Sequence, residues 1–341
     1  MTSVVENLLL PLDEEEGSAR GLALLRQQRG AWPMMASGYA SLAAVETRVM
    51  QFGDARIRIQ FNPQRITSSA ARVDEKSIRE RKCFLCPAHL PAGQRGFLWG
   101  EKFLVLCNPF PILRDHLTVP HVEHLPQEIL PWLPVFLRLT RDLGEHFTVF
   151  YNGPRAGASA PDHLHFQAGE KGFMGIEEEY EAGVGRHTAV AEGDSWRVEG
   201  IDDGLRRYIV IEGETPGGVT AAFLSVYGAL KDLPGGEGEP MMNILAVHGS
   251  AGWRLMVFPR TRHRPSFFFA EGEEKILLSP AAVDCGGVLT TPVEKDFRKL
   301  TASLVAQMFD EVMFPPAGFD RILAALRSLP TGRADTGPPS S

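Results

Sequence analysis

The sequence is poor in cysteine and has no long hydrophobic run. Its 341 residues include four cysteines, too few for a disulfide scaffold: Cys83, Cys86, Cys107 and Cys285. No stretch of 18 or more apolar residues occurs, which argues against a membrane span. The first residues lack a basic region ahead of their short apolar run, so we expect no signal peptide. We therefore expect a cytoplasmic protein without membrane partners.

An excess of positive charge is also absent. The net charge is -7 and the pI about 5.8, which removes the general electrostatic case for nucleic-acid binding. The apolar fraction of 44% and the charged fraction of 23% are ordinary for a soluble globular protein. We therefore expect no nucleic acid as a partner. An acidic chain can still bind phosphate at a local basic site, so small phosphate compounds remain possible ligands.

The pattern of apolar residues predicts two similar halves. In the first half we expect strands near 56–61, 101–112, 116–121, 147–153 and 163–169, with a helix near 126–143 and a glycine-rich loop at 153–161. In the second half we expect strands near 208–213, 241–249 and 253–260, with helices near 220–233, 293–313 and 317–328. The shared order of strand, helix, strand, loop and strand indicates a weak internal duplication.

These expectations define a fold class and boundaries. We predict an α+β protein with two halves, each an antiparallel sheet with packed helices. The expected segments are an N-terminal capping segment (1–50), a catalytic half (51–170), an acidic linker or insertion (171–206), a degenerate second half (207–330) and a disordered tail (331–341).

A metal site is indicated by Cys83-Phe-Leu-Cys86, the spacing at which two thiolates bind one zinc ion. Pro87 and the lack of a surrounding βαβ pattern argue against a redox pair, and two buried cysteines without a ligand role remain the plain alternative. His163 and His121 are the natural completing ligands, with His124 as a nearby competitor for His121.

The segment "HLHFQ" carries the candidate chemistry. His163, His165 and Gln167 alternate along a predicted strand and therefore point to one face. A neutral His165 beside a phosphate site can attack phosphorus and form a covalent phosphoramidate, provided that its other nitrogen is held as N–H. Gln167 can donate to a phosphate oxygen but cannot act as a general acid, which suits a leaving group that is already good. The plain alternative is an edge strand with three exposed polar residues.

Two further segments are candidate anion sites. The loop after the strand that ends at Asn152 includes Gly157 and small residues that let backbone N–H groups approach an anion. Arg260, Arg262, His263 and Arg264 crowd together in "PRTRHRP", and guanidinium groups bind phosphate in a bidentate fork. A solvated basic turn is the alternative for this cluster, and Arg65 is a weaker candidate contact.

Taken together, these motifs resemble the transferase branch of the histidine-triad superfamily, which includes uridylyltransferases and dinucleoside polyphosphate phosphorylases. The resemblance covers about residues 50–310 and includes "FNPQR" (61–65), Cys83-x-x-Cys86, "PHVEHLP" and His163-x-His165-x-Gln167. The segment "NILAVHGSAGWRLMVFPRTRHRP" (243–265) also resembles the second half of a less-studied bacterial branch of this superfamily. The chain departs from the uridylyltransferases at Asp162, where they have proline, and it lacks a visible second metal site.

The resemblance implies two histidine-triad-like halves and a nucleotidyltransferase or phosphorylase. It implies His165 as the nucleophile that carries the nucleotidyl group and Gln167 as a contact to the transferred phosphate. It further implies Asn152 and Ser159 as loop contacts, and a structural zinc ion held by Cys83, Cys86, His121 and His163. The expected ligands are a nucleotide and either inorganic phosphate or a phosphorylated acceptor. The protein itself is expected to be a monomer or a homodimer.

Three functions stay open from the sequence. The first is phosphorolysis of a dinucleoside polyphosphate or a similar nucleotide. The second is a sugar-nucleotide phosphorylase or uridylyltransferase-like exchange enzyme. The third is a nucleotide-binding protein that has lost catalysis.

Overall fold

The centre of the protein is a ten-stranded sheet in which all neighbouring strands run antiparallel. The computed structural model describes residues 3–12, 16–66, 73–233 and 238–328. In space the strands follow the order β3-β4-β5-β7-β6-β11-β12-β10-β9-β8. The strands of this sheet are β3 (Gly96–Trp99), β4 (Phe103–Cys107), β5 (His116–Pro120), β6 (Phe147–Asn152), β7 (His165–Glu170), β8 (Arg186–Gly193), β9 (Trp196–Asp202), β10 (Arg207–Gly213), β11 (Met242–Gly249) and β12 (Gly252–Pro259). This arrangement confirms the predicted α+β class with antiparallel sheets.

The two halves of this sheet repeat one strand order. Along the chain, β3, β4, β5, β6 and β7 form one half, and β8, β9, β10, β11 and β12 form the other. In each half, the strand that comes fifth in the sequence lies in space between the third and the fourth strands. The two halves join where β6 pairs antiparallel with β11. A single helix lies between the third and fourth strands of each half, α6 (Leu133–Leu143) and α8 (Pro216–Lys231). The sheet therefore has the duplicated element order that the sequence indicated.

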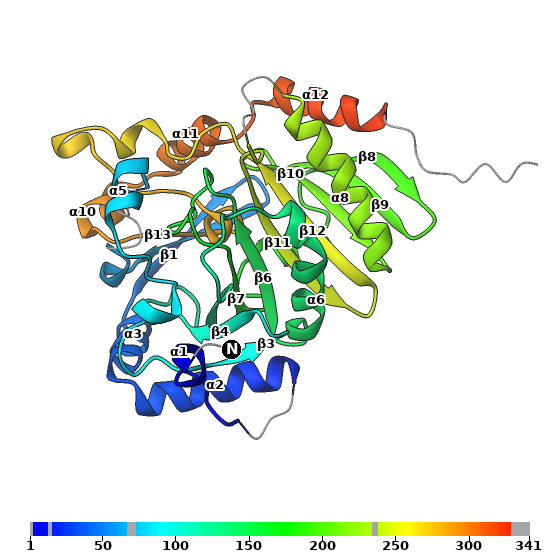
Figure 1. The fold of residues 1–341 in the computed structure, drawn as a ribbon. Helices are drawn as coiled ribbons and strands as arrows, with labels where there is room; N and C mark the ends of the chain where they lie inside the picture. Colours follow the sequence, from blue (N-terminus) through cyan, green and yellow to red (C-terminus); the bar gives the residue numbers. More distant parts are fainter. Residues whose placement is uncertain (1–2, 13–15, 67–72, 234–237, 329–341) are drawn as a thin grey trace, which may run out of the picture.

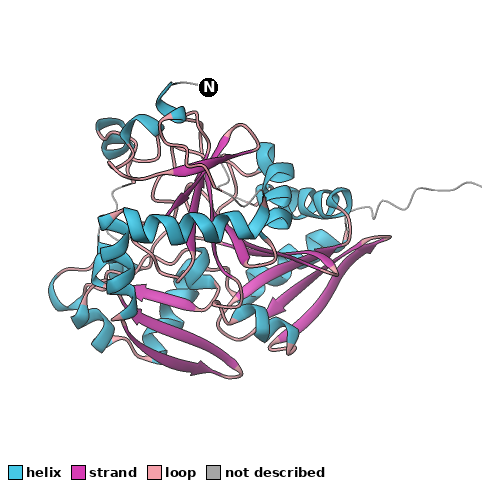
Figure 2. Ribbon diagram, turned by 90° about the horizontal axis from the view of Figure 1, so that it is seen from below, coloured by secondary structure: helices cyan, strands magenta, loops and turns pink. Residues whose placement is uncertain are grey.

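One face of the sheet is covered by helices with a continuous apolar core. In α6, Leu133, Phe136, Leu137, Thr140 and Leu143 recur at helical spacing and are buried. Helices α2 (Gly17–Ala31), α8 and α12 (Pro316–Arg327) lie on the same side, with α12 packed on α8 (Figure 1). Figure 2 shows α2 crossing in front of the strands. Helix α2 of the N-terminal segment therefore contributes to the apolar core on this face of the sheet.

The opposite face is covered by a smaller sheet and short helices. This three-stranded sheet has the order β1-β2-β13, formed by β1 (Glu46–Phe52), β2 (Ala55–Phe61) and β13 (Val288–Thr291). Because β13 pairs parallel with β2, a late segment of the chain lies beside an early one (Figure 1). The remaining helices are α1 (Ser3–Glu6), α3 (Pro33–Ala43), α5 (Glu75–Glu80), α7 (Ile176–Glu181), α9 (Ala282–Cys285), α10 (Glu294–Lys299) and α11 (Ala302–Val312), with 3-10 turns at Pro63–Arg65, Pro87–His89, Leu130–Trp132, Ser266–Phe268 and Gly272–Glu274.

Several boundaries differ from the prediction. The segment 171–206 is not a linker, because it contains α7 and the two outer strands β8 and β9. Strands β1 and β13 were not expected; the first also lies partly within the 1–50 segment. The helix expected at 293–313 is divided, since Leu300 leaves the helical conformation and the Thr301 side chain caps α11. The predicted tail at 331–341 lies outside the described residues.

None of the helices that the structure describes is long and apolar enough to cross a bilayer.

Candidate active site

A cavity of about 390 Å³ lies between the first half of the large sheet and the C-terminal segment. Its walls come from β4 to β7, the loop after β6, the Cys83–Cys86 turn, and residues between 263 and 290. Most of the predicted substrate and catalytic residues line it: Arg65, Asn152, Gly157, Ser159, His165, Gln167, His263 and Arg264. The fold thus gathers four separate predicted segments around one space.

His165 begins β7 and is 4% exposed. Its Nδ1 lies 2.8 Å from the carbonyl oxygen of His163, so this nitrogen carries the proton and donates. Gln127 holds the backbone on both sides, because its Oε1 accepts from the His165 N–H and its Nε2 donates to the His165 carbonyl. Burial lowers the pKa of His165 to about 4. The ring is therefore neutral at neutral pH, with the Nε2 lone pair available in the cavity.

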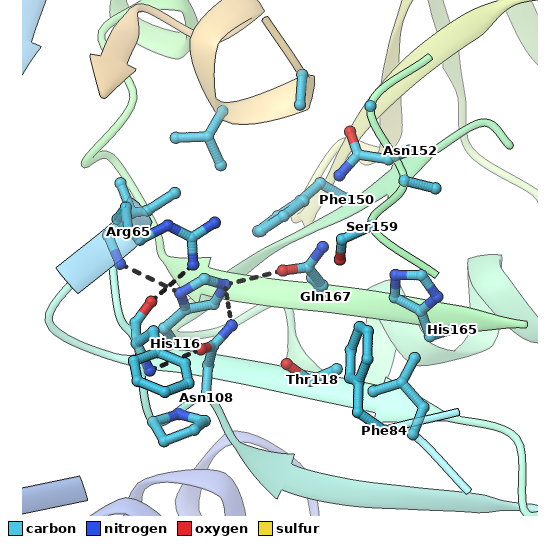
Figure 3. Close-up of a pocket in the computed structure, with 18 of the residues that line it drawn as sticks. Arg65, Phe84, Asn108, His116, Thr118, Phe150, Asn152, Ser159, His165 and Gln167 are labelled. Carbon is cyan, nitrogen blue, oxygen red and sulfur yellow. Dashed lines mark hydrogen bonds between the residues drawn. The ribbon is translucent and has the colours of Figure 1, made fainter. Parts of the chain in front are cut away.

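Gln167 lies two residues further along β7, on the same face (Figure 3). The Ile112 N–H donates to Nδ1 of His116, so Nε2 of His116 carries its proton and donates to Oε1 of Gln167 at 3.0 Å. Burial, followed by the charge of Arg65, lowers the pKa of His116 to about 3. With its oxygen occupied, the Gln167 amide offers N–H donors to a ligand.

The sequence prediction missed His116. The signal was present, because His116 and Thr118 alternate on β5, the strand that pairs with β7. Thr118 is the register partner of Gln167, and both residues line the cavity with His116. Reading the neighbouring strand for polar alternation would have found it.

Asn152 and the loop that follows β6 are held by the second half of the chain. Oδ1 of Asn152 accepts from Nδ2 of Asn243 and from the Ala282 N–H, both at 2.8 Å. These contacts orient the amide so that its nitrogen can donate into the cavity (Figure 3). Gly157 has φ +96°, and a Cβ there would lie 2.7 Å from Cβ of Ala281, so this position needs glycine.

The basic cluster at 260–264 divides into separate roles. Arg260 is 3% exposed and bonds Asn243 together with the carbonyls of Val312, Pro280, Arg262 and His263. Its predicted role as a substrate contact is therefore wrong: it supports Asn243, which supports Asn152. Arg262 lies outside the cavity, in a neighbouring groove with Phe269, and its predicted contact is also not supported. His263 and Arg264 do line the cavity.

The cysteine pair lies in a cluster suited to a metal ion. Ligand atoms of Cys83, Cys86, His124 and His163 all lie within 4.8 Å of one another. Nε2 of His163 donates to the carbonyl of His121 at 2.8 Å, which leaves Nδ1 facing Sγ of Cys83 at 3.3 Å. Nδ1 of His124 faces Sγ of Cys86, also at 3.3 Å. Two sulfur and two nitrogen donors in a closed set fit a structural, tetrahedral zinc site.

His121 was predicted as a ligand, and the structure corrects this to His124. The Glu123 N–H donates to Nδ1 of His121, and Nε2 is buried against Phe103 and Trp132 without a hydrogen bond among the described residues. The backbone of His121 still serves the cluster, because its carbonyl orients His163. Both histidines occur in "PHVEHLP", so spacing alone could not separate them.

Among its described residues, the second half has no equivalent of His165 on the matching face. Residues that pair across neighbouring strands lie on the same face of the sheet. From Phe150 on β6, this row of paired residues runs through Leu245, Met256 and Val210 to Glu199. On that face the described residues form an ion-pair network instead, with Arg254 and Arg197 on Glu212, and Glu199 beside His187. This explains why one half holds the candidate chemistry.

Comparison with known proteins supports the fold. A family model described as a domain of unknown function (DUF4922) matches residues 24–170, less than half of the chain. No curated protein matches this chain. Yeast Ap4A phosphorylase Apa2 in complex with AMP has a TM-score of 0.51 at 15% identity, covering 85% of this chain and 96% of that one. The same phosphorylase with Ap4A has a TM-score of 0.51 at 13% identity, covering 85% and 97%.

A uridylyltransferase mutant matches at lower similarity, with a TM-score of 0.35, 13% identity and coverage of 72% and 93%. At these identities the comparison with Ap4A phosphorylase shows a shared fold over most of both chains. This agrees with the fold that the resemblance implied.

Proposed function

We propose that this protein is a nucleotidyltransferase that acts through a covalent nucleotidyl-His165 intermediate. The observation that carries the proposal is the state of His165: buried, neutral, with Nδ1–H on the His163 carbonyl and Nε2 in the cavity. A histidine fixed in this tautomer is ready to act as a nucleophile without first losing a proton.

The first half-reaction follows from this geometry. Nε2 attacks the α-phosphorus of a nucleotide, a P–N bond forms, and the P–O bond to the leaving phosphate breaks with its electron pair on that oxygen. The imidazole ring gains positive charge, and the His163 carbonyl stabilises it through the Nδ1–H bond. In the second half-reaction an acceptor oxygen attacks phosphorus and Nε2 leaves with its electron pair, so His165 returns neutral.

The surrounding donors stabilise charge on the phosphate. Gln167 and Asn152 each have an amide oxygen occupied by the protein, so their amide nitrogens can donate to phosphate oxygens. Neither can protonate a leaving group. This favours a leaving group that departs as an anion, such as a phosphate or polyphosphate.

The nucleoside is assigned to the part of the cavity beside the metal cluster. Phe84 and Leu85 stand between the two cysteine ligands and line the cavity, and Phe84 lies close to His165 (Figure 3). An aromatic ring with an exposed face can stack on a base. On this proposal a zinc ion held by Cys83, Cys86, His124 and His163 has a structural role, keeping this wall in place.

We further propose phosphorolysis of a dinucleoside polyphosphate, with inorganic phosphate as acceptor. The shared fold with a phosphorylase whose structures contain AMP and Ap4A supports this substrate class. Sugar-nucleotide exchange and loss of catalysis are the competing functions, and both are outcomes of the experiment below.

The test is the intact mass of the protein after brief incubation with Ap4A, ATP, GTP, UDP-glucose and GDP-hexoses, without phosphate. We expect an increase of one nucleoside monophosphate in the wild type and in the control His187→Ala, which alters a histidine on the distant strand β8. The increase should be absent in His165→Ala. Turnover of that variant above a tenth of wild type would contradict the covalent mechanism.

Two further results separate the alternatives. Discharge of the adduct by a hexose 1-phosphate but not by inorganic phosphate would favour an exchange enzyme. Tight nucleotide binding without any adduct, unchanged in His165→Ala, would favour a binding protein that has lost catalysis.

A further inference from the structure

The cavity continues past the proposed transfer site. Figure 3 shows His165, Gln167, His116 and Arg65 in sequence along it, with Phe84 near His165 and Arg65 at the opposite end. His165 and Gln167 are two strand residues apart, about 7 Å. The end at Arg65 is therefore far enough from His165 to hold a second group bonded to, or attacking, the transferred phosphate.

Arg65 brings a positive charge to this end. It lies in the 3-10 turn after β2, and its Nη1 donates to the Phe110 carbonyl at 2.8 Å. Burial lowers the pKa of Arg65 to about 10, so the guanidinium remains charged at neutral pH. Among the described residues its side chain has this one hydrogen bond, to Phe110, and the nearby charge of Asp284 favours its charged form. A guanidinium has five N–H donors, so most of them are available to a ligand.

Thr290 provides a second, independent feature. This residue of β13 lines the cavity and is 8% exposed, yet its hydroxyl has no hydrogen-bond partner within the described chain. Leaving a buried hydroxyl unpaired is unfavourable, so such groups commonly mark a place where a ligand or water binds. Thr290 and Arg65 both line the cavity, and β13 packs against the turn that contains Arg65, which places the two residues near one another.

The nearby carboxyl of Asp284 is hydrogen-bonded by the backbone, and its charge offsets part of the positive charge of Arg65. Its two oxygens accept from the backbone N–H groups of Ala281 and Thr290. Burial raises the pKa of Asp284 to about 6, so the carboxyl is still mostly ionised at neutral pH beside Arg260 and Arg65. Arg264 adds a second positive charge to the cavity wall.

We propose that Arg65 and Thr290 bind the phosphate that exchanges with the nucleotide on His165. This inference rests on the proposed function. An oxygen of the bound phosphate attacks the nucleotidyl phosphorus, the new P–O bond forms, and the P–Nε2 bond breaks with its electron pair on Nε2. The product is a nucleoside diphosphate. In the reverse direction the same residues hold the leaving phosphate. The ligand is a tetrahedral phosphate group, either free or at the end of a polyphosphate.

The experiment separates the two half-reactions. Protein is first loaded with nucleotide to completion without phosphate, and the intact mass reads the adduct. The rate of discharge is then measured against the concentration of inorganic phosphate, with ATP and glucose 1-phosphate as other acceptors. We expect Arg65→Gln and Thr290→Val to raise the half-saturating phosphate concentration, about tenfold for the charged contact and less for the hydroxyl.

Matched controls and a second readout keep the result specific. Arg186→Gln and Thr47→Val change exposed residues on β8 and β1 and should leave the discharge curve unchanged. Thr290→Ser should restore phosphate affinity. Because Thr290→Val removes an unpaired buried hydroxyl, it should not lower the unfolding temperature, whereas a purely structural role predicts a loss of stability. Binding of the nucleoside monophosphate should be equal in all variants.

Failure of the inference is distinct from failure of the proposed function. Unchanged phosphate saturation in both variants would overturn the assignment of Arg65 and Thr290, even if the adduct forms. If ATP discharges the adduct with the same dependence on Arg65 while inorganic phosphate does not, the site takes the end of a polyphosphate rather than free phosphate. If no adduct forms, calorimetric titration with inorganic phosphate still decides the point, since only wild type and the controls should bind it.

Discussion

Nε2 of His116 lies 3.0 Å from Oε1 of Gln167, and this contact decides which end of the glutamine amide faces the cavity. A glutamine presented by its oxygen would repel phosphate oxygens, whereas one presented by its nitrogen donates to them. We therefore predict that His116→Ala slows adduct formation at His165 by about one to two orders of magnitude, as expected for the loss of one oriented donor.

A double-mutant cycle checks this positioning role. If His116 acts through Gln167, then His116→Ala should have little further effect in a Gln167→Ala background. The rate of adduct formation measured for the four proteins gives the coupling directly. Additive losses would instead mean that His116 contributes independently, as a packing residue.

The pH dependence of adduct formation should reflect the low pKa of His165. Because burial holds this pKa near 4, the nucleophile is neutral at all higher pH values. We predict a rate that is flat from pH 9 to about 5 and that falls below pH 4 as Nε2 becomes protonated. Single-turnover loading after brief pH jumps measures this profile. An inflection near 6.5 would show that the nucleophile titrates as an ordinary histidine.

The stability of the protein should also depend on pH through His116. Its folded pKa is about 3 and its ordinary value 6.5, so between these values the unfolded chain binds more protons. Stability attributable to this site is therefore lost as pH falls below 6.5, by about 1.4 kcal/mol per pH unit. His116→Asn removes this dependence. Urea unfolding at pH 6.5 and pH 5 measures the free energy of unfolding of both proteins. Between these pH values the difference between wild type and His116→Asn should fall by about 2 kcal/mol. A constant difference would contradict the lowered pKa of His116.

Metal content should separate the two histidines of "PHVEHLP". His124 presents Nδ1 to Cys86, while His121 is turned away and bonded to the Glu123 N–H. We predict that His124→Ala purifies with less than stoichiometric zinc, whereas His121→Ala retains one ion per chain. Elemental analysis of both variants and the wild type gives the answer. The reverse pattern would restore His121 as the ligand.

The sequence allowed much of this site to be predicted where one strand carried the information. His163, His165 and Gln167 follow from alternation along β7, and their common face needed no knowledge of other segments. Contacts between distant segments were not accessible in this way. Arg260 lies among charged neighbours in sequence, but the fold buries it against Asn243, so composition alone suggested the wrong role. Thr290 sits on a four-residue strand too short to predict, and only the parallel pairing with β2 brings it to the cavity.

The Cys/His cluster and the cavity share a wall, so the proposed function predicts that removing a metal from this cluster weakens nucleotide binding. Phe84 and Leu85 line the cavity from the turn that Cys83 and Cys86 close. Without a metal ion, this turn keeps the hydrogen bond from the Cys86 N–H to the Cys83 carbonyl, two hydrogen bonds with His89, and the packing of Cys83, Leu85 and Ala160. We predict that chelation lowers nucleoside monophosphate affinity several-fold, because the stacking ring of Phe84 loses its fixed position. Phe84→Ala provides the matched control: its affinity should already be low and should respond little to chelation. Equal losses in both proteins would mean that the metal supports the cavity by another route.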